Sequence, residues 1–169
     1  MKKLFPFILL VAVAMTFTFC GGSGSTDSTG TDGDSSADKA SGEVELVTIE
    51  NDKIGFTILA PKEAKVLADT EYNFTTSQVL GANEINVSVG PAVGEIKTVD
   101  AFKADLDMMM AKNITKAEAT EGGFMAVNEQ GTLLVTVYHR VGKVMAKVSV
   151  PPSKRDIAEK IAMSVTSTK

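Results

Sequence analysis

The stretch that decides the fold lies near the C-terminal end and reads Leu133-Leu134-Val135-Thr136-Val137-Tyr138-His139-Arg140-Val141-Gly142-Lys143-Val144-Met145-Ala146-Lys147-Val148-Ser149-Val150-Pro151-Pro152. Its two runs, 133–138 and 144–150, alternate between branched apolar residues and other residues. A period of two is the pattern of a strand with one buried face. We therefore expect a long antiparallel hairpin with its turn at Val141-Gly142. Pro151-Pro152 ends the sheet, because proline has no N–H to give to the ladder.

The same period recurs in the segments that precede this hairpin. It predicts strands at 44–49, 54–59, 72–80, 84–89, 114–119 and 124–129. In segment 54–59 the residues Ile54, Phe56 and Ile58 share one face, and Pro61 stops the strand. In segment 84–89 we expect Ile85, Val87 and Val89 to point inward. Gly122-Gly123 is typical of a tight turn.

Two segments change to the helical period. From 99 to 110 the apolar positions are Val99, Phe102, Leu106, Met109 and Met110. Thr98 is the expected N-cap of this helix, and Asn113 can close it in a left-handed conformation. A closing helix follows Ser153-Lys154-Arg155-Asp156, which resembles a capping box, and its apolar stripe is Ile157, Ala158, Ile161, Ala162 and Val165. The chain is thus predicted to be α+β, an antiparallel sheet with two helices packed on one face.

The N-terminal region has the order of a secretory signal. Lys2 and Lys3 precede an apolar run, and the single cysteine of the chain, Cys20, directly follows that run. This position resembles the lipid acceptor of a bacterial lipoprotein, whose thiol is diacylated before cleavage. The resemblance implies a signal peptide at 1–19, a lipidated Cys20, and a chain held on a membrane of the bacterial envelope. If the cell is Gram-negative, the absence of Asp after Cys20 favours the outer membrane.

Three other interpretations of this region stay open. A signal peptidase could cut after Ala14, since Ala12-Val13-Ala14 fits a small-x-small site. The run could remain as an uncleaved anchor, although it is shorter than the roughly 20 residues that span a bilayer core. Cys20 could also be a structural cysteine. Phe19, just before it, departs from the small residue that lipoprotein processing usually takes.

Residues 20–42 are rich in Gly, Ser, Thr and Asp and have no aromatic or branched aliphatic residue. Such a segment cannot bury enough apolar surface to offset its ordering entropy, so we expect a disordered tether before a globular domain at 43–169. The whole chain has a net charge of −4 at pH 7. This balance argues against nucleic acid as a partner, because phosphate binding needs clustered Lys and Arg.

The order of elements from Ile54 to Val165 resembles the PsbP-like family, which includes bacterial envelope lipoproteins of the DcrB and LpqN type. The residues that carry the resemblance are Gly55-Phe56-Thr57-Ile58-Leu59-Ala60-Pro61, Val148-Ser149-Val150-Pro151-Pro152 and Lys160-Ile161-Ala162-Met163-Ser164-Val165. The resemblance implies a sheet-and-helix sandwich and a non-enzymatic accessory role, and it implies no catalytic residue.

Few residues are candidates for chemistry. His139 is the single histidine, so neither a Ser/His/Asp device nor a typical zinc site can be assembled. The sequence predicts no metal and no cofactor. Tyr138, His139 and Arg140 lie by the hairpin turn, where we expect a solvated strand end that could form a partner-binding tip. Asp105 and Asp107 should face different directions. Met108-Met109-Met110 suggests a soft-metal site or an adaptable apolar surface, but helical spacing assigns Met109 and Met110 to the core.

These observations predict a lipid-anchored envelope protein that binds or stabilises another envelope component and is not an enzyme. Two alternatives remain. The domain could carry or sense a small apolar ligand, in a pocket lined by Phe56, Phe102, Met109 and Val137. It could also be a hydrolase with a carboxylate or Ser/Lys device, which would need a concave site with convergent polar groups.

Overall fold

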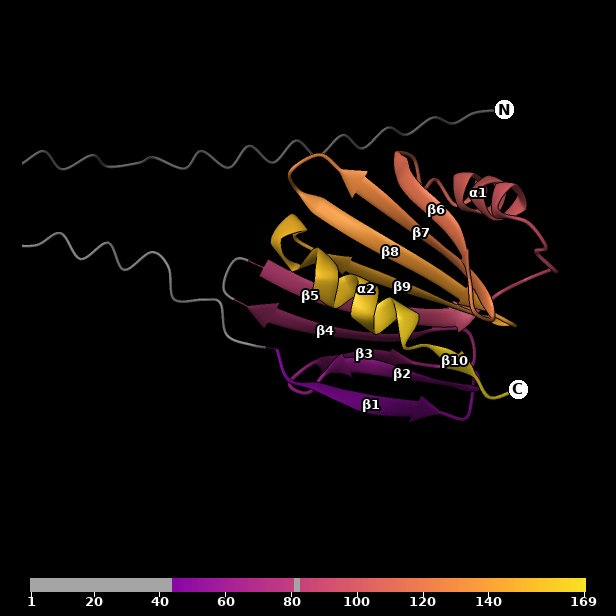
Figure 1. The fold of residues 1–169 in the computed structure, drawn as a ribbon. Helices are drawn as coiled ribbons and strands as arrows, with labels where there is room; N and C mark the ends of the chain where they lie inside the picture. The colour runs from indigo at the N-terminus through magenta and orange to yellow at the C-terminus, as the bar shows by residue number, and fades with distance from the viewer. Residues whose placement is uncertain (1–43, 81–82) are drawn as a thin grey trace, which may run out of the picture. The chain divides into compact units, whose positions relative to one another are not determined.

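The computed structural model describes residues 44–80 and 83–169. The predicted signal peptide at 1–19, Cys20 and the tether at 20–42 lie outside these residues. The described part is α+β, with antiparallel sheets and two α-helices, as expected (Figure 1). None of its helices is long and apolar enough to cross a membrane.

The described strands form two antiparallel sheets. The larger sheet has the order β3-β4-β5-β9-β8-β7-β6, and the smaller has the order β1-β2-β10. The strands of the larger sheet are β3 (Lys65–Asp69), β4 (Phe74–Leu80), β5 (Asn83–Pro91), β6 (Ile114–Thr120), β7 (Gly123–Gln130), β8 (Leu134–Val141) and β9 (Val144–Val150). Those of the smaller sheet are β1 (Leu46–Asn51), β2 (Phe56–Pro61) and β10 (Thr166–Ser167). The sequence pattern missed β3, which is mostly exposed, and the two-residue β10.

The helices are α1 (Val99–Met108) and α2 (Arg155–Met163), and a 3₁₀ turn, η1 (Pro152–Lys154), precedes α2. Thr98 caps α1 as expected, since its side chain accepts a hydrogen bond from the Ala101 N–H. The capping box expected at Ser153 is wrong. The N-cap of α2 is Lys154, without a side-chain cap, because the 3₁₀ turn after Pro151 moves the helix start along the chain.

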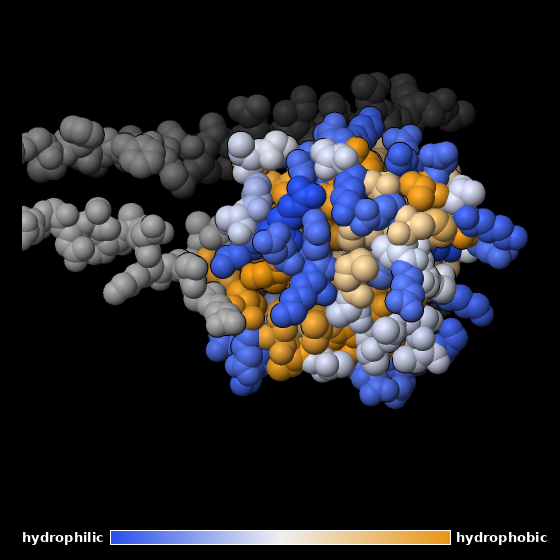
Figure 2. Space-filling model, viewed as in Figure 1, coloured by the Kyte–Doolittle hydropathy of each residue, from blue (hydrophilic) through white to orange (hydrophobic). Residues whose placement is uncertain are grey.

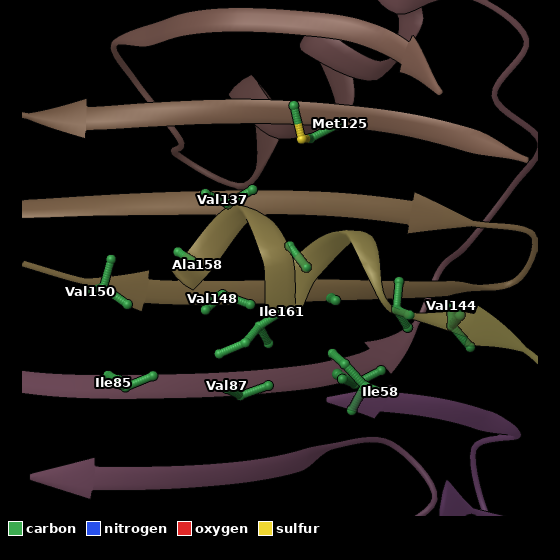
Figure 3. Close-up of a cluster of buried hydrophobic side chains, with 14 of the residues drawn as sticks. Ile58, Ile85, Val87, Met125, Val137, Val144, Val148, Val150, Ala158 and Ile161 are labelled. Carbon is green, nitrogen blue, oxygen red and sulfur yellow. The ribbon is translucent and has the colours of Figure 1, made fainter. Parts of the chain in front are cut away.

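The main core lies between one face of the larger sheet and a cover made of α2 and the smaller sheet. Val144, Ala146, Val148 and Val150 of β9 all point into this core, and β2 contributes Phe56 and Ile58. Ala158, Ile161, Ala162 and Val165, from the predicted stripe of α2, are fully buried against them. Figure 3 shows Val137, Val148, Ile161 and Ile58 converging in this layer. Polar side chains cover the outer side of α2 (Figure 2).

The two helices pack on opposite faces of the larger sheet, not on one face as predicted. Alternation along β7 shows this, because Met125 and Val127 belong to the main core while Ala126 belongs to a second core. The second core contains Phe102 and Leu106 of α1. The sequence pattern identifies the apolar stripe of each helix, but it does not say which face of the sheet that stripe covers.

The end of α1 also differs from the prediction. Met109 and Met110 are exposed, so they do not belong to the core. The helix ends in a Schellman motif, in which the Ala111 N–H bonds to the Leu106 carbonyl and the Met110 N–H bonds to the Asp107 carbonyl. Met110 occupies the left-handed position of this motif, with φ of 61°. Asn113 is left-handed as expected, with φ of 68°, but it does not close the helix, because Met110 takes that position three residues earlier.

We expect Met110→Gly to stabilise the domain. Glycine reaches the left-handed region without the steric penalty of a Cβ atom, so the free energy of unfolding should rise by about 1 kcal/mol in urea titrations. Met108→Gly is the matched control. It replaces a helical residue two positions earlier and should lower the same free energy by up to about 1 kcal/mol. A loss of stability in both variants would contradict the assignment of Met110 as a strained cap.

Candidate functional site

The three predicted site residues lie inside a strand, not at a hairpin tip. β8 extends to Val141, and the turn falls at Gly142-Lys143, one residue later than predicted. His139 is 2% exposed and Arg140 is 4% exposed, so the expectation of a solvated strand end is wrong for both. Both residues are buried because β8 pairs with a strand on each side. His139, for example, pairs with Met125 of β7 and with Ala146 of β9. Tyr138 is half-buried.

His139 points into the main core and ties three elements together. Its Nδ1 lies 2.9 Å from the carbonyl oxygen of Ala162 in α2, and its Nε2 lies 2.9 Å from Oγ1 of Thr120 in β6. A carbonyl can only accept, so Nδ1 carries the proton and Nε2 of the neutral ring accepts from the Thr120 hydroxyl. Burial lowers the pKa of His139, and the hydrogen bond to Ala162 opposes this shift in part.

Arg140, the next residue, points to the opposite face of the sheet. Its Nη2 donates to the carbonyl oxygens of Val93, at 3.2 Å, and of Gly94. Its Nη1 lies 3.6 Å from Oδ2 of Asp105 in α1. Asp107, two residues further, is exposed, so the two carboxylates face different directions as expected. Arg140 thus fixes the loop that joins β5 to α1.

This loop forms one wall of a hollow of about 370 Å³ at the end of the sheet where β8 turns into β9. Two hairpin turns form the rest of it, so segments far apart in sequence meet there (Figure 1). The lining residues are Gly94, Glu95, Ile96, Gly122, Gly123, Phe124, Arg140, Gly142 and Lys143. The sequence pattern gave no sign of this site, because the 90–98 loop matches no phosphate-binding motif and the hairpin turns are separate in the chain.

Glycine is required at several lining positions. Gly122 and Gly142 have φ of 86° and 54°, in the left-handed region that glycine reaches without steric cost. A Cβ atom on Gly123 would lie 1.8 Å from the Arg140 carbonyl oxygen, so no larger residue fits there. These glycines leave backbone groups, rather than side chains, at the surface of the hollow.

The remaining lining side chains combine an apolar wall with a charged rim. Ile96 and Phe124 pack partly against the second core. Glu95 and Lys143 are exposed, and Glu95 is paired with Lys97 at 3.3 Å. The lining has no Ser, Thr, Cys or His side chain, and its ionisable side chains are Glu95, Arg140 and Lys143. The surface of the hollow thus combines apolar side chains, backbone groups and exposed charges.

The pocket expected for a small apolar ligand is not formed by its predicted residues. Phe56 and Val137 belong to the main core, while Phe102 belongs to the second core on the other side of the sheet. All three are completely buried, and Met109 is exposed. The larger sheet therefore separates the residues that this alternative needs to bring together. Among residues 44–80 and 83–169, no cluster of His, Cys, Asp and Glu side chains could hold a metal ion.

We expect the single histidine to titrate below its ordinary pKa of 6.5. The folded domain keeps His139 neutral, so the unfolded chain takes up the proton first as the pH falls. The contribution of the neutral His139 to the free energy of unfolding is fully present above pH 6.5. It declines below that pH by at most about 1.4 kcal/mol per unit, until the folded pKa is reached.

His139 is the single histidine, so its ring-proton NMR signal can be followed alone. The midpoint of the pH titration of this signal gives the pKa of His139 directly. Urea titrations of the wild type and of His139→Gln between pH 7 and pH 5 supply the control, since the variant should lose less stability over this range. A midpoint at or above 6.5 would rule out the buried, neutral ring.

No protein-family model and no curated protein sequence matches this chain. Among solved structures, the described fold is similar to the 1.9 Å crystal structure of the Saccharomyces cerevisiae Ran-binding protein Mog1p. The two chains are 11% identical, the match covers 75% of this chain and 97% of that chain, and the TM-score is 0.46. At these values the similarity carries no argument about partner or function.

Proposed function

We propose that this chain is a lipid-anchored protein of the bacterial cell envelope, whose domain binds another envelope protein through the hollow at the β8–β9 turn. In this proposal Cys20 carries the lipid, residues 20–42 are the tether, and the protein is not an enzyme. The observation that carries the proposal is the position of the hollow. It lies at the end of the domain opposite to the start of β1, where the tether would join (Figure 1).

The strand register also places the hollow and the start of β1 at opposite ends of the domain. Leu46 at the start of β1 pairs with Pro61 at the end of β2, whereas Phe56 at the other end of β2 pairs with Ser167. Ser167 in turn lies beside Gly142, since a Cβ atom on that glycine would be 3.4 Å from the Ser167 Cβ. The start of β1 and the hollow are thus separated by the length of β2. A tether of Gly/Ser type with a mean reach of roughly 25 Å would leave the hollow free to meet a partner away from the membrane.

The two-layered main core is compatible with the proposed PsbP-like sandwich. In this arrangement α2 and the smaller sheet cover one face, and α1 covers part of the other. Both helices are then used for packing. The turns and the β5–α1 loop stand at the end of this rigid scaffold, a place where binding residues are common.

A binding role fits the chemistry better than hydrolysis. Both ring nitrogens of His139 are already engaged, with Ala162 and Thr120, and the ring faces the core rather than the hollow. Nη2 of Arg140 donates to two carbonyl groups, while Nη1 lies 3.6 Å from Asp105 and has no hydrogen-bond partner. These residues hold the site in shape. The groups left to contact a partner are Ile96, Phe124, Lys143 and the glycine backbone.

Site-specific photo-crosslinking in cells tests the proposal. A photoreactive amino acid at Lys143, on the rim of the hollow, should capture a discrete envelope protein. The matched control is the same amino acid at Thr48, an exposed position on β1 in the smaller sheet. We expect a crosslinked band from position 143 and none from position 48. Identical bands from both positions, or no band from position 143 while the protein is present and folded, would contradict the proposal.

A further inference from the structure

The larger sheet ends in two edge strands, β3 and β6, and their edges differ. The last residue of β3, Asp69, is covered by side chains from the end of β1 and the turn after it. Its carboxylate accepts hydrogen bonds from Asn51 and Lys53, and its carbonyl oxygen accepts another from Lys53. Among the described strands, β6 pairs with β7 alone. β6 therefore presents a side on which the described sheet does not continue.

β6 has the features of a strand that can accept a neighbour. Its seven residues, Ile114–Thr120, include no proline, so no backbone donor is missing. The register with β7 shifts between Ile114 and Lys116 and is regular from there to Thr120. The outer N–H and C=O groups of such an edge pair readily with a strand of another chain. The sheet can therefore be extended at β6.

The charged side chains of β6 indicate which strand fits. Lys116 and Glu118 are two residues apart, so they project from the same face of the sheet. Their charged groups lie 2.8 Å apart, and the two side chains are 42% and 44% exposed. Ala117, between them, packs against the second core on the other face. A lysine alone would discourage any neighbouring strand, but a cation and an anion on either side of a small residue are complementary to the same pattern reversed.

We propose that β6 pairs antiparallel with β6 of a second copy of this chain, with the two copies of Ala117 opposite each other on a two-fold axis. Lys116 then lies opposite the partner's Glu118, and Glu118 lies opposite the partner's Lys116. Directly opposite residues of an antiparallel pair share a face, with Cβ atoms about 4.5–5.5 Å apart. The four charges therefore alternate in sign along one face, and the two larger sheets become one continuous sheet.

The same charges exclude the neighbouring registers. A pairing with Lys116 or Glu118 on the two-fold axis would place like charges directly opposite each other, which is destabilising. The pairing does not rest on the proposed function, because the residues that line the hollow all lie outside β6. The hollow stays open in both copies.

Sedimentation velocity of the full chain in detergent tests this pairing. The parent protein carries Cys20→Ser, because a free thiol could link two copies. We expect a reversible dimer with a Kd of about 100 µM or tighter. Lys116→Glu turns two attractive pairs into two repulsive pairs and should raise the Kd by about tenfold or more. Lys116→Glu combined with Glu118→Lys restores both pairs and should return the Kd to the parent value.

Lys97→Glu is the matched control. It removes another exposed ion pair, with Glu95 at 3.3 Å, but lies outside β6, so this variant should dimerise like the parent. Circular dichroism of each variant checks that the domain is folded. The proposal is overturned if the parent is monomeric well above 100 µM, or if folded Lys116→Glu dimerises as tightly as the parent.

A cysteine on the two-fold axis tests the register. In the same parent, Ala117→Cys places two thiols on residues whose Cα atoms are about 4.5–5.5 Å apart, which is within reach of a disulfide. Mild oxidation should link the two copies, whereas Thr48→Cys, at an exposed position on β1, should stay unlinked. Equal linkage at positions 117 and 48, or none at position 117, would contradict pairing about Ala117.

Discussion

The alternation of side chains along β8 is the constraint on which the structure depends. Consecutive residues of a strand point to opposite faces, so His139 and Arg140 leave the sheet on different sides. His139 holds the end of α2 through the Ala162 carbonyl. Arg140 holds the β5–α1 loop and faces α1 through Asp105. One dipeptide near the end of an inner strand thereby contacts both helices. A shift of the β8 register by one residue would exchange the two contacts and bury the guanidinium in an aliphatic core.

This arrangement also explains where a binding surface can form. The main core covers one face of the inner strands of the larger sheet, and α1 closes part of the other face. At the end of the sheet, two-residue turns and the loop held by Arg140 enclose a hollow that no side chain fills. The hollow and the free edge of β6 are distinct features. The first depends on glycines and on a fixed loop, and the second depends on a strand that pairs on one side within the described sheet.

The local patterns of the sequence predicted much of the fold. The strands around Phe56, Ile85 and Val148, the cap at Thr98 and the stripe of α2 are set by neighbouring residues, and all are confirmed. The errors concern choices that depend on distant parts of the chain. The β8–β9 turn lies one residue further along than predicted, and pairing with β7 and β9 buries His139 and Arg140. Neither the face chosen by α1 nor the hollow could be predicted, because each requires segments that are separate in sequence to meet.

The proposed role depends on the lipid anchor as much as on the domain. The position of the hollow supports this role only if the N-terminal end of the domain is attached to a membrane. Mass spectrometry of the N-terminus of the protein purified from its native membrane tests this most directly. We expect a mature chain that begins at Cys20 with the mass of a diacylglyceryl group on its thiol. A chain with a free Cys20 thiol, or one that begins after Ala14, would contradict it.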